Sequence, residues 1–126
     1  MLLVGFFSTA QSYSKNLDFN NLILQFDDAS SDLKEEYIPL LYLFADTLKK
    51  TPSMHVTIRG HVCCVKRNRL AKKRAAIVYD YLLLFGVNSK QLTKIGMKNS
   101  IPVIFPEKSK KDELANMRVD FVIRKD

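Results

Sequence analysis

The chain has 126 residues, 47% of them hydrophobic, which suits a single domain with one apolar core. Glycine and proline number four each, so the sequence is neither a linker nor a low-complexity chain, and no apolar run approaches the ~20 residues that span a bilayer. The formal net charge of +7 favours anionic partners, namely nucleic acid, acidic lipid head groups or a carboxylate-bearing cell-wall polymer.

The N-terminal segment is similar to the end of a secretory signal. Residues 2–7 are mostly apolar, and the small residues 8–10 after them would form a cleavage site before Gln11. A basic leader is absent from this stretch, so a short strand or an interface segment is the alternative. We expect residues 1–20 to be an N-terminal extension, made of a signal remnant and a linker, and residues 21–126 to form the domain.

The first half of the domain predicts a strand followed by a helix. Residues 22–26 indicate a first, buried strand, and the polar residues 27–32 indicate a turn and a helix N-cap. Apolar residues then recur three and four positions apart as far as Lys50, which is typical of a helix with one buried face. They are Tyr37, Leu40, Leu41, Phe44 and Leu48. Because proline is tolerated best in a first turn, we expect the main helix to begin close to Pro39.

The next segments predict a second strand and a second helix. Residues 54–59 alternate between apolar and polar side chains, as a half-buried strand requires, and residues 60–67 read as a loop. A helix is predicted over 68–85, with Gly86 as its C-terminal cap. Its apolar stripe comprises Ala71, Ala75, Val78 and Leu82, widened by Leu70, Ile77 and Leu84.

Two further strands complete the pattern, over 92–97 and 119–124, with a charged linker over 107–115 that has room for a short helix. The predicted order is β-α-β-α-β-β. It indicates an α/β (α+β) two-layer sandwich, in which the helices pack on one mixed sheet.

The cysteines and histidine in the loop do not form a recognisable metal or catalytic site. Cys63 and Cys64 are adjacent, which excludes a framework of loop-closing disulfides. A zinc site with His61 would need four ligands, and no matching His/Cys cluster follows. No nucleophile stands at a recognisable spacing from His61. We therefore expect no metal, no cofactor and no enzymatic activity.

A basic run over 66–74 offers a rival interpretation, since six of its nine residues are cationic. Such a run is compatible with nucleic-acid contact. Aromatic residues are not interleaved in it, however, and no nucleic-acid motif accompanies it. We do not expect nucleic acid to be the partner.

The second half of the chain also carries a series of residues whose order and spacing resemble those of the peptidoglycan-binding domain of outer-membrane protein A and its relatives (OmpA-like domains). The resemblance covers about residues 22–124 and implies the same order of strands and helices. The residues are Gly60, His61, Asn68, Leu70, Arg74, Ala75, Val78, Tyr81, Leu82, Gly86, Val87, Leu92, Gly96, Pro102, Asn116, Met117, Arg118 and Val119.

The resemblance implies a ligand, the diaminopimelate unit of peptidoglycan. In the family, an arginine of the second helix and an aspartate two residues after the Gly-His histidine grip this unit. Arg74 falls on the arginine, whose fork matches a carboxylate bidentately. The family's aspartate would neutralise the ammonium of this unit, and Cys63 falls on its position. Losing one partner of such a charge-assisted pair costs ~1.5–3 kcal/mol. Asp27 and Asp28, from the first loop, are the candidates to replace the aspartate.

Three further positions are implied as ligand-binding by the resemblance. Asn68 lies one residue from the family's asparagine, which falls on Arg67, and as the first residue of a helix it is also an N-cap candidate. Arg118 keeps one of the family's two C-terminal arginines. His61 is expected to orient or pack rather than to catalyse.

Two functional hypotheses follow. In the first, the chain is a domain of the bacterial periplasm that binds peptidoglycan and anchors an outer-membrane or periplasmic assembly to the cell wall. In the second, the pocket is degenerate, and the domain is a structural or docking subunit of an envelope complex such as a secretion-system core. The missing aspartate favours the second hypothesis, whereas Arg74 and Arg118 favour the first.

Overall fold

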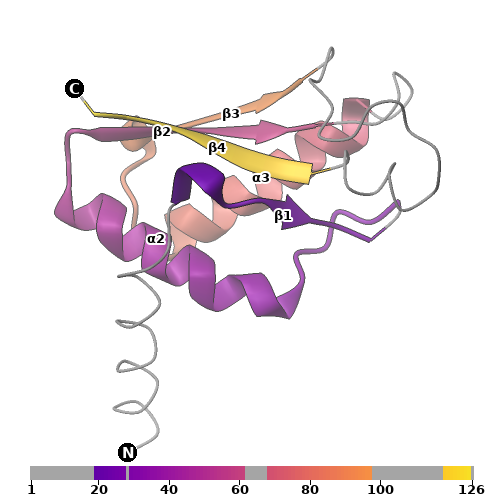
Figure 1. Cartoon of the computed structure of the whole chain (residues 1–126), viewed down its shortest axis with the longest axis horizontal. Helices are drawn as coiled ribbons and strands as arrows, with labels where there is room; N and C mark the ends of the chain where they lie inside the picture. The colour runs from indigo at the N-terminus through magenta and orange to yellow at the C-terminus, as the bar shows by residue number, and fades with distance from the viewer. Residues whose placement is uncertain (1–18, 28, 62–67, 98–117, 126) are drawn as a thin grey trace, which may run out of the picture.

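The computed structural model describes residues 19–27, 29–61, 68–97 and 118–125. The predicted order of elements is confirmed in these residues (Figure 1). The elements are η1 (Phe19–Asn21), β1 (Leu24–Gln25), η2 (Glu35–Tyr37), α2 (Ile38–Lys50), β2 (Met54–Gly60), α3 (Asn68–Leu84), η4 (Ser89–Gln91), β3 (Leu92–Gly96) and β4 (Arg118–Lys125). The predicted signal remnant, the cysteine loop and the charged linker lie outside the described residues.

The four strands form one mixed sheet in the order β1-β4-β2-β3. β4 is antiparallel to both of its neighbours, whereas β2 and β3 are parallel and are joined through α3. Both helices lie on the same side of the sheet (Figure 1). The expected two-layer arrangement, with helices packed on one mixed sheet, is therefore confirmed.

The predicted alternation of the second strand holds in the structure. Val56 and Ile58 are fully buried against the helices, and Ile58 pairs across the sheet with Phe121 of β4. Arg59, the next residue along β2, pairs with Asp120, so both of these side chains belong to the opposite face of the sheet. The register of β2 on β4 thus places opposite charges side by side.

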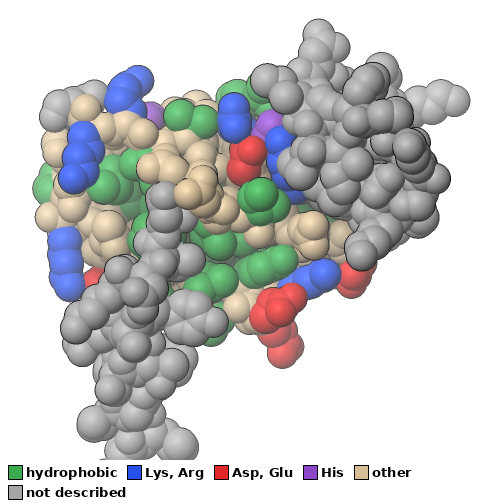
Figure 2. Space-filling model, in the orientation of Figure 1, with side chains coloured by type: hydrophobic (Ala, Val, Ile, Leu, Met, Phe, Trp, Pro, Cys, Tyr) green, Lys and Arg blue, Asp and Glu red, His purple; other side chains and the backbone are tan. Residues whose placement is uncertain are grey.

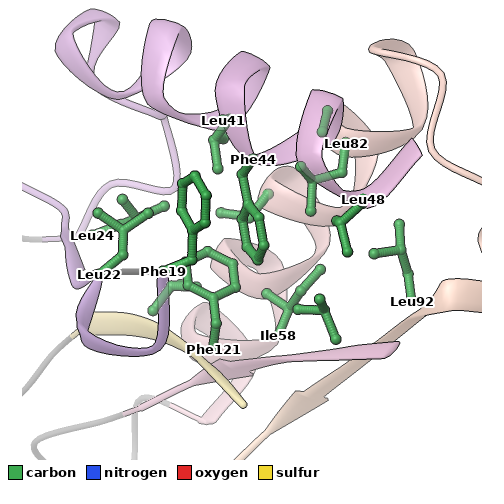
Figure 3. Packing of buried hydrophobic residues seen from close by; sticks show 14 of the residues in the cluster. Phe19, Leu22, Leu24, Leu41, Phe44, Leu48, Ile58, Leu82, Leu92 and Phe121 are labelled. Atoms are coloured by element: carbon green, nitrogen blue, oxygen red, sulfur yellow. The ribbon is translucent and has the colours of Figure 1, made fainter. Parts of the chain in front are cut away.

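Aromatic rings join the N-terminal end of the described chain to the sheet (Figure 3). Phe19 stacks on Phe44 of α2 with 4.4 Å between ring centroids, and Phe44 meets Phe121 edge to face at 5.1 Å. Such offset and edge contacts are the preferred geometries of aromatic pairs. The packed core therefore includes Phe19, which precedes residue 21.

The helices begin and end where the sequence predicts. Pro39 lies in the first turn of α2, after the short turn η2, where its missing N–H removes no helical hydrogen bond. Gly86, with φ of 96°, ends α3. Its N–H donates to the carbonyl of Leu83, while the N–H of Val87 donates to that of Leu82, the hydrogen-bond pair of a Schellman cap.

The structure corrects two details of the predicted core. The first strand is shorter than 22–26 and is not a continuous buried run, because Ile23 is 41% exposed between two buried neighbours. Leu84 is 74% exposed, so it does not widen the apolar stripe of α3. The four residues on which that stripe was based, Ala71, Ala75, Val78 and Leu82, are all buried.

Among the described helices, none combines the length and the apolar character that crossing a membrane requires.

Candidate functional site

Arg74 is held inside the protein by the turn that follows β1. Its side chain leaves α3 and is 1% exposed. Nε donates a hydrogen bond to the carbonyl of Ser30 at 2.7 Å, and one terminal nitrogen donates to the carbonyl of Asp27 at 2.9 Å. The guanidinium also lies over the ring of Phe26, 5.1 Å from its centroid. These contacts fix the orientation of the guanidinium plane.

The turn itself is shaped to present these carbonyls. The N–H of Ser30 donates to the carbonyl of Asp27, and the hydroxyl of Ser30 accepts from the N–H of Asp32. Between them, Ala29 has φ of 61°, in the left-handed region that a residue with a Cβ rarely adopts. Such a conformation costs about 1–2 kcal/mol. The turn therefore stores a little strain at the place where it contacts Arg74.

Asp27 contributes to this arrangement through its backbone rather than its carboxylate. Its side chain is 81% exposed and lies 3.6 Å from the ammonium of Lys34. An exposed pair of this kind contributes little to stability. The carboxylate of Asp27 thus stands at the surface of the same turn whose carbonyl orients Arg74, while the alternative candidate, Asp28, lies outside the described residues.

A second polar cluster surrounds Asp120 on β4. Arg59 donates two hydrogen bonds to its carboxylate, at 2.9 and 3.1 Å. His61 bonds the same carboxylate through Nε2 at 2.8 Å, and Nε of Arg118 lies 3.6 Å from it. Figure 2 shows acidic, basic and histidine side chains close together over the end of β2 and the start of β4. One carboxylate is therefore shared by three potentially cationic groups.

Electrostatics in this cluster favour the charged form of the carboxylate. Burial by itself would raise the pKa of the Asp120 carboxyl, but the hydrogen bonds and charges of His61 and Arg59 outweigh it and hold that pKa below its usual value. Burial lowers the pKa of Arg118; the charge of Asp120 opposes this, and Arg59 adds to it. Asp120 is thus an ionised group that neutralises its neighbours.

The sheet brings these two clusters to one end of the molecule. Gln25, just before the Arg74-contacting turn, pairs with Arg118 at the start of β4. The backbone N–H of His61 donates to the carbonyl of Arg118 at 2.7 Å. Gly60, one residue earlier, lies so close to α3 that a Cβ on it would meet the carbonyl oxygen of Ala71 at 2.1 Å. Four segments therefore converge at this end of the molecule: the end of β2, the exit of β1, the start of β4 and the first turns of α3.

The structure places the five predicted site residues as follows. Arg74 and Asp27 are in contact through a backbone carbonyl, and His61 and Arg118 meet around Asp120. Asn68 is the first residue of α3, and its side chain lies outside the described part of the structure.

Sequence reasoning missed Arg59 and Asp120. The alternation of β2 did predict that Arg59 faces away from the core. Its pairing with Asp120 depends on the register of two strands that are 61 residues apart in the chain, and no local signal specifies that register.

Within the described residues, no group of three or more His, Cys, Asp or Glu side chains could hold a metal ion.

Comparison with known proteins gives a consistent result. The model of the OmpA family matches residues 25–116, and a search of curated proteins gave no match. Among solved structures, the peptidoglycan-associated lipoprotein of Burkholderia pseudomallei is 28% identical with a TM-score of 0.75, covering 81% of this chain and 89% of that one. The C-terminal domain of Helicobacter pylori MotB is 25% identical with a TM-score of 0.74, covering 83% and 85%.

A third structure, the OmpA-like domain of FopA1 from Francisella tularensis, has a TM-score of 0.67 and covers 82% of this chain and 71% of that one. At 21% identity this likeness concerns the fold alone.

Proposed function

The chain belongs to the OmpA family, and we propose that it is a non-catalytic domain of the bacterial cell envelope that binds the diaminopimelate unit of peptidoglycan. In this role it would anchor an outer-membrane or periplasmic assembly to the cell wall. The similarity to a protein named as peptidoglycan-associated supports the proposal.

The observation that carries the proposal is the fixed orientation of Arg74. Two backbone carbonyls and an aromatic ring hold its guanidinium in place. A carboxylate that reaches the guanidinium would form a charge-assisted, fork-like pair, which is about twice as strong as a neutral hydrogen bond. Because the group is already oriented, little side-chain entropy is lost when the ligand binds.

The other residues of the site have supporting roles in this proposal. The exposed carboxylate of Asp27 would accept the ammonium of diaminopimelate, after exchanging its contact with Lys34 for the ligand. Arg118 would add positive charge for the remaining carboxylates of the cell-wall peptide. His61, held by Asp120, would fix the backbone where β2 ends, and Asn68 would contact the ligand from the start of α3.

A second candidate function rests on one observation and on the resemblance to the family. Arg74 is 1% exposed, and the resemblance implies that Cys63 occupies the position of the family's aspartate. Both are compatible with a domain whose ligand pocket is degenerate and which serves as a structural or docking subunit of an envelope complex. Protein partners, rather than peptidoglycan, would then explain its retention.

Sedimentation with purified diaminopimelate-containing sacculi tests the proposal. Arg74→Gln removes the charge and the fork, while Arg69→Gln removes the same charge from an exposed position of the same helix. We expect the parent chain and Arg69→Gln to co-sediment, and Arg74→Gln to bind about ten- to a hundredfold more weakly, as ~1.5–3 kcal/mol implies. Thermal unfolding of each variant verifies that it is folded.

Two results would contradict the proposal. If both variants lose affinity equally, and binding falls steeply with salt, only diffuse electrostatics are at work. If the folded parent does not sediment with sacculi at all, the docking function is the better explanation. Affinity purification from envelope extracts should then recover the same partners with the parent and with Arg74→Gln.

A further inference from the structure

β3 is an edge strand within the described part of the chain. It pairs with β2 on one side only, because the sheet order places it last. Its side chains alternate between the two faces of the sheet. Thr93 bonds His55 at 3.0 Å on the face away from the helices, and Ile95 shares that face. Lys94 lies on the α3 side, where its ammonium sits 4.5 Å from the ring centroid of Tyr79.

A crevice of about 480 Å³ runs between this edge strand and α3. It is lined by Lys72, Ala75, Lys94, Ile95 and Gly96. Two of these residues are cationic and none is acidic. The crevice is therefore a concave, positively charged site between α3 and the edge of the sheet.

The two lysines are held at the crevice by different contacts. A Cβ on Gly96 would lie 2.5 Å from Cγ of Lys72, so the stem of this lysine occupies the space over the glycine backbone. Lys94 is held by its cation–π contact with Tyr79. Both stems thus add apolar surface to the walls, as long cationic side chains often do.

We propose that the crevice and the edge of β3 bind an extended acidic segment of a partner protein. The segment adds to β3 as a further strand, through the backbone groups that an edge strand presents. Every second side chain of an added strand points to the α3 side. Carboxylates at those positions meet Lys72 and Lys94, while the intervening side chains cover Thr93 and Ile95.

Charge decides between this occupant and a second copy of the chain. Pairing of two β3 edges would bring the lysines of both copies to the same seam, where like charges directly opposite one another are destabilising. The net charge of +7 also repels a second copy and attracts an acidic partner. The proposal does not involve Arg74, so it stands or falls separately from peptidoglycan binding.

Fluorescence anisotropy on the full chain with a labelled peptide tests the proposal. The probe has about eight residues that alternate glutamate and valine, the usual length of a strand. A second probe carries N-methyl groups on alternate backbone nitrogens, which block strand addition but leave the charge unchanged. A third replaces glutamate with lysine. Hydrogen exchange of the β3 amides, with and without the first peptide, reports on where it binds.

We expect saturable binding of the first peptide alone, together with slower exchange of the Lys94 and Gly96 amides. These amides face the open edge, because the N–H of Met97 donates to the carbonyl of Gly60 in β2 and amides alternate in direction along a strand. The double substitution Lys72→Gln/Lys94→Gln should weaken binding about five- to thirtyfold, as two partly exposed ion pairs imply. The matched control Lys73→Gln/Lys90→Gln removes the same charge from two exposed positions that do not line the crevice. It should weaken binding less than about twofold.

Three results would overturn the proposal. Equal weakening by both double substitutions would mean that only net charge attracts the peptide. Equal binding of the N-methylated peptide, or unchanged exchange of the β3 amides, would mean that no strand is added. If the first peptide does not bind the folded parent, the lysines serve only to keep this edge from pairing.

Discussion

Replacing Asp120 with asparagine should destabilise the protein far more than the same change elsewhere. The carboxylate side chain is 13% exposed and accepts two hydrogen bonds from Arg59 and one from His61. Asparagine keeps the shape but offers a single acceptor oxygen and no charge. His61 and Arg118 are 2% and 6% exposed, so they would remain buried without their shared carboxylate.

The size of the effect follows from these contacts. Hydrogen bonds to charged groups contribute ~1.5–3 kcal/mol each, and removing one partner of a buried ion pair costs ~3–5 kcal/mol. Arg59 is 30% exposed and can turn towards water, which reduces the loss. We expect the free energy of unfolding to fall by about 2–4 kcal/mol, a large share of the ~5–15 kcal/mol typical of a domain.

Urea denaturation at neutral pH measures this loss, and Asp46→Asn is its matched control. Asp46 pairs with Lys50 at 3.0 Å on the surface of α2, where the side chains are 47% and 75% exposed. Its substitution should cost no more than about 0.5 kcal/mol. If Asp120→Asn costs no more than Asp46→Asn, the cluster does not stabilise the fold in the way we infer.

Acid provides a second readout of the same reasoning. The pKa of Asp120 is lower in the folded state than its ordinary value, which in the unfolded chain is about 3.9. Its contribution to stability is therefore complete above that value and is lost as the pH falls through the folded-state pKa. The difference in stability between the parent and Asp120→Asn should shrink below about pH 4, and a difference that is constant with pH would contradict the assignment.

Two further predictions concern packing. Gly60→Ala should lower the free energy of unfolding by several kcal/mol or prevent folding, as overpacking of a core does. The added Cβ would meet the carbonyl oxygen of Ala71 at 2.1 Å. A melting curve by circular dichroism that matches the parent would refute the close approach. Leu82→Ala should lower the free energy of unfolding by about 2–5 kcal/mol, whereas Leu84→Ala, at a site 74% exposed, should change it by less than about 0.5 kcal/mol. Equal losses in urea denaturation would show that α3 is oriented differently.

The sequence predicts the order of the elements well because each element has a local signature. The apolar period of α3 depends on neighbours three and four residues apart, and the alternation of β2 depends on neighbours two apart. Pro39 and Gly86 restrict the backbone at the positions where they stand, so they mark where α2 begins and α3 ends. None of these signals needs a distant partner.

Burial at the ends of elements is less predictable. Ile23 belongs to an apolar run, yet it points outward between the buried Leu22 and Leu24, since neighbouring side chains of an extended segment face opposite sides. Leu84 is two residues after the buried Leu82, about 200° around α3, so it faces solvent although Val87 beyond it is buried. Both errors arise because hydrophobicity reports how a side chain prefers to be placed, whereas burial also requires a neighbour.

What the sequence by itself determined is the fold and the position of Arg74 on α3. The tertiary structure decided what that arginine does in the free protein, since its carbonyl partners lie 44 and 47 residues away in the chain. It likewise decided that Arg59, His61 and Arg118 share Asp120. Local patterns specify periodicity, but partnerships between charges depend on strand register and on how a turn meets a helix, and those are fixed only when the chain folds.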